Sequence, residues 1–306
     1  MITSELIKKK ARELGASVCG IGKIYSEPDK QRDPLMILPS AKCIIGFGFS
    51  VPRGLYYAMK NGNQIYTYIS LGVKHAEVVQ SEIFLLKMTG LIEDEGYDAC
   101  PQCNVPHLRV KGDKTTNPEP MDTYELIFAE PVAEGKPAPD VMLDFAKAAE
   151  ACGIGKAGVS GSILNEKYGP FMRYCFIITD APLDVDENTA PDLCDGCMEC
   201  ANACPGYAIS REGIDTWQCA PYYKGAHKSN PYITDEFLKG HPDREKILNG
   251  EYRFDAQSAR VVYPELNFLP DAHSFSPCMC AKACDIACYE HLKALGRLSA
   301  GKESDR

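Results

Sequence analysis

The segment LCDGCMECANACPGYAI, residues 193–209, ends its run of cysteines with Pro205. Its cysteines have the spacing C-x2-C-x2-C-x3-C, which is typical of bacterial ferredoxins. In that pattern the first three cysteines bind one [4Fe–4S] cluster and the fourth binds a different one. Zinc sites more often use two separated pairs of ligands, so the pattern favours iron–sulfur clusters. The cysteines of this run are Cys194, Cys197, Cys200 and Cys204.

A second cysteine-rich segment, PCMCAKACDIACYEHL, covers residues 277–292. An x3 gap precedes Cys288, as it precedes Cys204, so we expect Cys288 to complete cluster one. Cluster two then takes Cys204 and three further cysteines. We favour Cys219 and Cys284 for two of these places, and Cys280 over Cys278 for the third. The alternative is a single cluster followed by a cysteine-rich tail without a redox role.

The composition is that of a soluble globular protein that uses cysteine heavily. The chain has 306 residues, 45% of them hydrophobic and 25% charged, with 15 cysteines and a net charge of −9. This acidity argues against nucleic acid or an anionic membrane as the main partner. No apolar run approaches the roughly 20 residues of a membrane span, and no signal peptide is evident. We therefore expect a cytoplasmic protein, in which cysteines are more often metal ligands than disulfides.

Strands and helices are predicted in alternation over the first 180 residues, which is typical of an α/β layer. Short apolar runs predict the strands. The expected strands cover residues 16–22, 42–50, 125–132 and 173–180.

Helices are predicted over 4–14, with Ser4 as the N-cap, and over 140–151. A longer helix is predicted over 74–93, and its apolar spacing indicates which face should be buried. That face contains Ala76, Val79, Ile83 and Leu86. A polar linker over 181–192 then separates the α/β region from the cysteine-rich region. Within the latter, residues 222–275 are expected to form an inserted surface segment.

The stretch GIGKAGVSGSILNEKYGPFMRYCFIITDAPL, residues 153–183, precedes the cysteine run, and DTWQC (215–219) follows it. Together these segments resemble the epoxyqueuosine reductase and reductive dehalogenase superfamily. The resemblance implies a cobalamin-binding α/β reductase domain over 1–185 and a ferredoxin-like module with two [4Fe–4S] clusters over 186–306. In epoxyqueuosine reductases a lone cysteine after the first run binds cluster two, and Cys219 matches that place.

Two features depart from the pattern of epoxyqueuosine reductases. Their catalytic aspartate matches Pro139 here, with Asp140 beside it, and Tyr289 follows Cys288 where a proline is usual. These departures argue against epoxyqueuosine as the substrate. Asp140 is nevertheless the first candidate for a catalytic acid, and Tyr66 and His107 are further candidate proton donors.

The glycine-rich loop over 153–161 is the candidate corrinoid-binding element, because in the resembling family a loop of this kind approaches the corrin ring. The candidate contacts are Gly155, Lys156, Gly158 and Gly161. The loop also fits G-x-G-x-x-G, but a dinucleotide site requires a preceding strand and a following helix, and neither is predicted. CPQC, residues 100–103, could be a redox pair or, with His107, part of a metal site.

Two functions remain open from sequence. The first is a cobalamin-dependent oxidoreductase that takes electrons from a donor such as a ferredoxin or flavodoxin and reduces a small organic substrate. A nucleic acid partner is expected only if the substrate is a tRNA, as in epoxyqueuosine reductases. The second is an electron-transfer or activating protein that reduces a partner protein and has no substrate of its own. Both fit a cytoplasmic, anaerobic setting.

Overall fold

The computed structural model describes most of the chain, in several segments. They are residues 2–64, 67–104, 109–111, 125–127, 141–187, 190–230, 233–262, 280 and 282–299.

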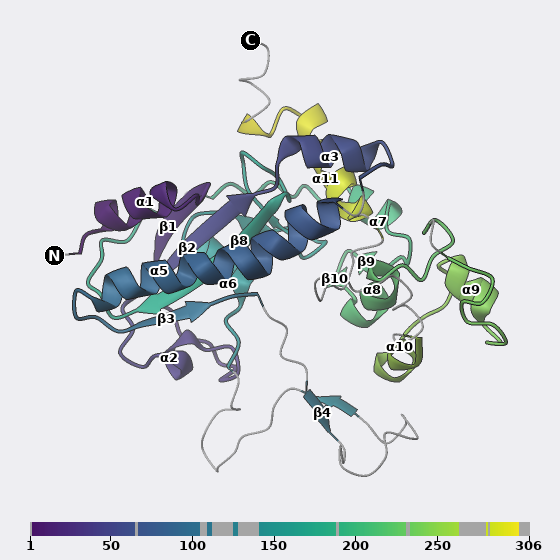
Figure 1. The fold of residues 1–306 in the computed structure, drawn as a ribbon, viewed down its shortest axis with the longest axis horizontal. Helices are drawn as coiled ribbons and strands as arrows, with labels where there is room; N and C mark the ends of the chain where they lie inside the picture. The colour runs from purple at the N-terminus through teal and green to yellow at the C-terminus, as the bar shows by residue number, and fades with distance from the viewer. Residues whose placement is uncertain are drawn as a thin grey trace.

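A four-stranded antiparallel sheet forms the centre of the N-terminal region (Figure 1). Its strand order is β1-β2-β8-β3, so β8 from late in the region pairs between β2 and β3. The strands are β1 (Val18–Lys23), β2 (Cys43–Ser50), β3 (Ala99–Gln102) and β8 (Met172–Thr179). Three of the four predicted strands are thereby confirmed, and the described part of the fourth is also a strand, over Glu125–Ile127. The region is a mixed α/β fold whose main sheet is antiparallel.

Side chains of β8 alternate between two cores, as successive residues of a strand must. Cys175 and Ile177 point to one face, where α1 (Ser4–Glu13) and α5 (Ser81–Glu93) cover the sheet. Figure 1 shows α5 lying across that face. Tyr174, Phe176 and Ile178 point to the other face, where α6 (Phe145–Ala151) packs.

Glycines in β1 let the end of α6 approach the sheet closely. A Cβ atom added to Gly20 would lie 2.0 Å from the carbonyl oxygen of Cys152. One added to Gly22 would lie 2.5 Å from the carbonyl oxygen of Ala151. Because real side chains cannot approach backbone atoms so closely, glycine at these positions allows α6 to rest directly on the sheet.

The helix predicted over 74–93 is confirmed but is longer, because the π-helix η1 (Tyr68–Gln80) precedes α5 without a break. Of the face predicted to be buried, Ala76 is buried, but the other three residues are not. Val79, Ile83 and Leu86 are among the exposed large hydrophobic residues, and Leu86 is 71% exposed. The buried side carries Phe84, Leu85, Met88 and Ile92 instead.

The start of α1 also differs from the prediction. Thr3 is the N-cap, and its side chain accepts a hydrogen bond from the amide of Leu6. The Ser4 hydroxyl instead donates to the carbonyl oxygen of Asp184 at 2.9 Å. The cap therefore lies one residue earlier, and Ser4 ties the helix to the linker that follows the sheet.

The cysteine-rich region consists of short elements beside the sheet (Figure 1). Helix α11 (Ala283–Ala294) lies against α7 (Glu199–Asn202), and α3 (Arg53–Lys60) joins α11 to the N-terminal region. There, the rings of Tyr56 and Tyr289 lie 4.6 Å apart, and Lys60 pairs with Glu290 at 2.7 Å.

The segment after Cys219 has a small core of its own. Residues from α8 (Thr216–Tyr223), α9 (Arg244–Leu248) and α10 (Ala256–Val262) enclose Tyr222, Ile247 and Phe254. The remaining elements are α2 (Pro34–Ile37), β4 (Arg109–Lys111), β5 (Glu125–Ile127), β6 (Lys156–Ala157), β7 (Ile163–Leu164), β9 (Ile209–Ser210) and β10 (Gly213–Ile214). No helix among the described residues is both long and apolar enough to cross a membrane.

Candidate functional site

Four cysteines that are far apart in the sequence surround one small cavity. Three come from the run around α7, and Cys288 comes from α11. Apolar side chains of Leu164, Leu193 and Leu292 close the cavity, and Gly158 borders it from the loop after β6. Four thiols facing a closed apolar space are what a [4Fe–4S] cluster requires. The cysteines of this first set are Cys194, Cys197, Cys200 and Cys288.

The electrostatics of this first set show that its thiols crowd together. Burial raises the pKa of the Cys288 thiol to about 12, and negative charge at Asp285, Cys200 and Cys194 raises it further. Burial likewise raises the pKa of Cys200, with further contributions from Cys197 and Cys194. Thiolates so close together repel one another, and a bound cationic cluster relieves that repulsion while releasing their protons.

A second set of cysteines gathers where α8 meets the N-terminus of α11. Burial raises the pKa of Cys219 to about 12, and negative charge at Cys280 and Cys204 raises it further. Burial also raises the pKa of Cys284, and Cys280 and Cys219 contribute there. The structure therefore groups Cys219, Cys280 and Cys284 with Cys204 from the first run. The Ala208 amide donates a hydrogen bond to the Cys204 sulfur at 3.3 Å.

Each of the two cysteine segments contributes a residue to the set formed mainly by the other segment. Cys204 leaves the first run for the second set, whereas Cys288 leaves the second cysteine segment for the first set. The alternative ligand Cys278 lies outside the described residues. The choice between Cys280 and Cys278 as the third additional ligand of cluster two therefore stays a prediction.

The first set reaches the protein surface at Cys197, which is exposed. The Cys197 amide donates to the Asp195 carboxylate at 3.2 Å. Asp195 is also 2.9 Å from His291 Nε2 and 3.7 Å from an Arg297 guanidinium nitrogen. The hydrogen bond from His291 lowers the pKa of Asp195. Cys197 is therefore the exposed cysteine of the first set.

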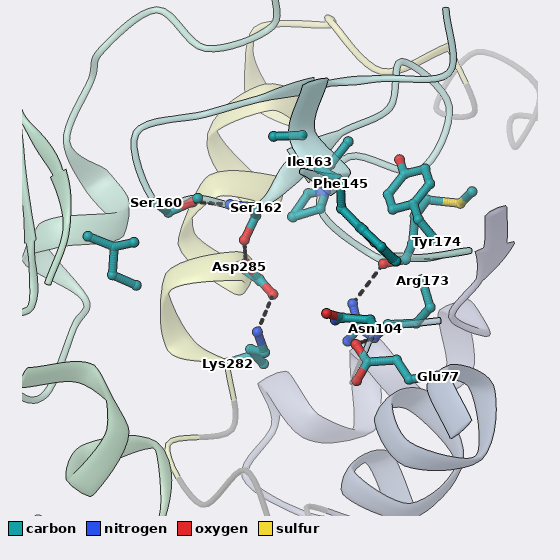
Figure 2. A pocket seen from close by; sticks show the side chains of 15 residues that line it. Glu77, Asn104, Phe145, Ser160, Ser162, Ile163, Arg173, Tyr174, Lys282 and Asp285 are labelled. Carbon is teal, nitrogen blue, oxygen red and sulfur yellow. Dashed lines mark hydrogen bonds and ion pairs between the residues drawn. The ribbon is translucent and has the colours of Figure 1, made fainter. Parts of the chain in front are cut away.

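A larger pocket of about 340 Å³ lies between the sheet and the second cysteine set (Figure 2). One wall is formed by Arg173 and Tyr174 of β8 with Glu77 of η1. The opposite wall is formed by Lys282 and Asp285 at the start of α11. The loop over 160–163 forms the third side, and Ser160 of this loop also borders the cavity of the first cysteine set.

Each of two opposite walls of the pocket contains a pair of oppositely charged side chains. On one wall, Ser162 donates a hydrogen bond to Asp285 at 2.6 Å, and Lys282 lies 3.6 Å from the same carboxylate (Figure 2). On the other wall, Arg173 Nε lies 3.3 Å from the Glu77 carboxylate, although this contact lacks hydrogen-bond geometry. The pocket thus presents one acidic and one basic side chain on each side.

The wall that contains Arg173 also has a buried polar atom, the hydroxyl oxygen of Tyr174. The Tyr174 hydroxyl is enclosed and has no hydrogen-bond partner among the described residues. Burial raises the pKa of Tyr174, which keeps the phenol protonated. Arg173 is better satisfied, because it donates to the Met172 carbonyl at 2.8 Å and to the Tyr68 hydroxyl at 3.2 Å.

The glycine-rich loop reaches the site with only part of its predicted residues. Gly161, with a φ of 78°, lines the larger pocket, and Gly158 lies beside the Cys194 sulfur. Gly155 is packed against Ile163 and the Tyr174 hydroxyl, where a Cβ atom would lie within 2.8–3.2 Å of its neighbours. Lys156 is 3.3 Å from Glu150. The predicted helix before this loop and the strand after it are confirmed by α6 and β7.

The three predicted catalytic residues, Tyr66, His107 and Asp140, lie outside the described residues, so their roles stay predictions. CPQC is described, and its two thiols face opposite sides of the sheet. Cys100 lies opposite Ile178 of the α6 core, whereas Cys103 packs against the α5 core. The geometry does not bring them together as a redox pair.

Four charged residues of the pocket were missed by sequence reasoning: Glu77, Arg173, Lys282 and Asp285. Arg173 lies in an otherwise apolar strand. A single charged residue in such a strand is a signal of a polar site that the sequence did offer. Asp285 lies inside the run CDIAC, between two predicted ligands. A buried acid between cluster ligands is unusual because burial of an unpaired charge is costly, and this was a usable signal.

The structure brings eight cysteines into two sets of four, and four thiols are the ligand set of one [4Fe–4S] cluster. A family model described as a 4Fe-4S binding domain matches residues 190–210. An epoxyqueuosine reductase of Bacillus cereus is 26% identical over 248 residues, which is 79% of this chain and 53% of that protein. A tetrachloroethene reductive dehalogenase of Dehalobacter restrictus is 37% identical over 76 residues, covering 24% of this chain and 14% of that protein.

A solved catabolic reductive dehalogenase shares the fold. Its TM-score is 0.50 at 17% identity, with 97% of this chain and 37% of that chain covered. The chain is therefore similar to epoxyqueuosine reductases and reductive dehalogenases, as its sequence suggested. The chain spans about half the length of the first two epoxyqueuosine reductases that it matches.

Proposed function

We propose that this chain is an iron–sulfur oxidoreductase with two [4Fe–4S] clusters. Cys194, Cys197, Cys200 and Cys288 would hold cluster one, and Cys204, Cys219, Cys280 and Cys284 would hold cluster two. Two such clusters supply electrons one at a time. The observation that supports this most strongly is the convergence of two separate cysteine segments on two sets of four thiols.

We further propose that the chain divides near residue 186. Residues 1–185 would form the part that binds cofactor and substrate, and residues 186–306 would form the ferredoxin-like module. The sheet and its covering helices support the first part. The two cysteine sets and the short elements around them support the second.

The cluster that borders the larger pocket is cluster two. Lys282 and Asp285 alternate along the chain with Cys280 and Cys284, and both charged residues line the pocket. Cluster one instead reaches the surface at Cys197. We therefore propose that an external donor, such as a ferredoxin or flavodoxin, approaches at Cys197, and that the substrate binds on the cluster-two side.

A corrinoid is the proposed second cofactor, and the pocket offers a partial fit. Its volume of about 340 Å³ is near the lower end of ligand pockets, which span roughly 300–1,000 Å³. The lining residues can contact one edge of a corrin ring, with Gly161 giving room for close approach, but they do not enclose a whole corrinoid. When bound, such a group supplies a cobalt centre for the reduction of organic compounds.

The chain's own residues define what the substrate would meet in this pocket. Arg173 and Glu77 face Lys282 and Asp285 across the space, so a small polar molecule finds both donors and acceptors. The protonated Tyr174 phenol lies behind this wall. The net charge of −9 makes a small organic substrate a better match than a tRNA.

One experiment separates this proposal from its alternative. The chain is reconstituted anaerobically with iron and sulfide, incubated with hydroxocobalamin and desalted, and its cobalt content and visible spectrum are recorded. Retention of about one cobalt beside about eight irons supports a corrinoid-dependent reductase. About eight irons without cobalt would reject the corrinoid and leave an electron-transfer or activating protein, which the modest size of the pocket also favours.

A further inference from the structure

Asp285 is a buried acid located between the ligands of both proposed clusters. It follows Cys284 directly and precedes Cys288 by three residues on α11. Residues three apart on a helix share a face, so its carboxylate lies near Cys288 as well as Cys284. The Asp285 oxygen is 4.0 Å from the Cys284 sulfur, and the residue is only 1% exposed.

The contacts of Asp285 fix its carboxylate in this position. The Ser162 hydroxyl donates to it at 2.6 Å, and Lys282 lies 3.6 Å away. Asp285 is also in the first turn of a helix of 12 residues, where the helix dipole favours a negative charge. The Lys282 side chain is 25% exposed, so water screens its charge more than that of Asp285.

A fixed negative charge at this position opposes the reduction of either cluster. One-electron reduction takes [4Fe–4S]²⁺ to [4Fe–4S]⁺ and therefore adds negative charge beside Asp285. Interactions between charges about 4 Å apart are several-fold stronger in a buried environment than in water. The effect should be larger at cluster two, because the Asp285 carboxylate contacts the Cys284 sulfur.

From this geometry we propose that Asp285 sets the reduction potentials of both clusters, holding them below the values that a neutral side chain would give. The proposal rests on the proposed function, since it presumes that both clusters are present. Asp285 acts here as a positioning and charge-setting residue, and no contact with a substrate is needed. Lys282 has the opposite role and partly offsets the carboxylate.

The test is an anaerobic redox titration of the reconstituted full chain with dithionite, followed by electron paramagnetic resonance. Asp285→Asn keeps the shape and can still accept from Ser162, but it removes the charge. We expect it to favour reduction of cluster two at least tenfold, a rise of about 59 mV for one electron. Cluster one should shift in the same direction by less.

Two further variants make the test specific. Glu199→Gln is the matched control, because Glu199 precedes the cluster-one ligand Cys200 but is exposed. It should change either reduction equilibrium less than about threefold, because solvent screens an exposed charge. Lys282→Met should shift the potential of cluster two downward, opposite in sign to Asp285→Asn.

The outcomes separate the two proposals. Wild-type protein that binds no more than about four irons would reject the two-cluster function itself. Wild-type protein with about eight irons, together with an Asp285→Asn shift no larger than that of Glu199→Gln, would reject the role of Asp285 alone. If Asp285→Asn does not bind its clusters, the sign for Lys282→Met decides: a downward shift supports the proposal, and no shift or an upward shift overturns it.

Discussion

The Ser162 hydroxyl donates a hydrogen bond of 2.6 Å to the Asp285 carboxylate, which joins the loop after β6 to α11. The same loop places Gly158 beside the Cys194 sulfur and Ser160 between the two cavities. One short segment of the N-terminal region therefore contacts the surroundings of both cysteine sets. This loop is the structural connection between the sheet and the proposed clusters.

Ser162→Ala should weaken that connection. Hydrogen bonds to charged groups contribute about 1.5–3 kcal/mol, so the free energy of unfolding of the reconstituted protein should fall by that amount. Urea unfolding under anaerobic conditions measures the change. Ser210→Ala is the control, because Ser210 is exposed at the end of β9 and should change stability by less than about 0.5 kcal/mol. Equal effects for the two variants would contradict a special role for Ser162.

Single cysteine substitutions should remove one cluster at a time. Cys288→Ser should lose cluster one and Cys219→Ser should lose cluster two, each leaving about four irons per chain after anaerobic reconstitution. Cys100→Ser should keep about eight, because Cys100 faces the α6 core away from both sets. A Cys280→Ser variant that keeps eight irons, beside a Cys278→Ser variant that loses four, would transfer the ligand role to Cys278.

The two faces of α5 should differ sharply in their effect on stability. Met88 is completely buried, so Met88→Ala should cost about 2–5 kcal/mol of unfolding free energy. Leu86 is 71% exposed, so Leu86→Ala should cost less than about 0.5 kcal/mol. Chemical denaturation of the two variants measures the difference. Comparable losses would mean that the face predicted from sequence is buried in solution.

Glycine substitutions should act in opposite directions at two positions. Gly20→Ala forces a Cβ atom to within 2.0 Å of the Cys152 carbonyl oxygen and should destabilise the protein by about 1–3 kcal/mol or more. Gly90 lies inside α5 with nothing within 4 Å of its added Cβ atom. Gly90→Ala should therefore stabilise the protein by about 0.5–1 kcal/mol. A higher midpoint temperature of unfolding for Gly20→Ala than for Gly90→Ala would contradict the close packing of α6.

Stability should fall as the pH rises above about 9. Burial raises the pKa of the Cys43 thiol to about 11 and that of Cys19 to about 12. Below the pKa that these thiols have in the unfolded chain, both the folded and the unfolded state keep the protons. Above it the unfolded chain loses them first, so the free energy of unfolding falls until the pH reaches the raised pKa of the folded state. Urea midpoints between pH 8 and 10.5 measure the slope. The double variant Cys19→Ala/Cys43→Ala should show a shallower slope than wild type, and an unchanged slope would contradict this origin.

The strands and the cysteine pairing could be predicted from sequence because each depends on a local signal. Apolar runs identified β1, β2 and β8, and the x3 gaps before Cys204 and Cys288 indicated the exchange of ligands between the two sets. The buried face of α5 could not be obtained in this way. Apolar residues lie all around that helix, so the choice depends on how Phe84 packs against Phe47 and Phe49, with ring centroids 4.8 and 5.1 Å away.

The pocket was less predictable because its walls come from several segments that are far apart in the sequence. Glu77, Arg173 and Asp285 are far apart in the sequence. They meet because η1, β8 and the start of α11 all line the same pocket. For the CPQC motif, the sequence suggested a function that the geometry does not support. Its spacing suggested a redox pair, but a strand at this place directs the two thiols to opposite faces of the sheet.

The most direct test of the central claim is the content of iron and acid-labile sulfide per chain after anaerobic reconstitution, measured on wild type and on Cys219→Ser. Two interlocked clusters predict about eight irons and eight sulfides in wild type and about half of each in the variant. Four irons in both proteins would contradict the account, because a single cluster would then be held by the first set of cysteines alone.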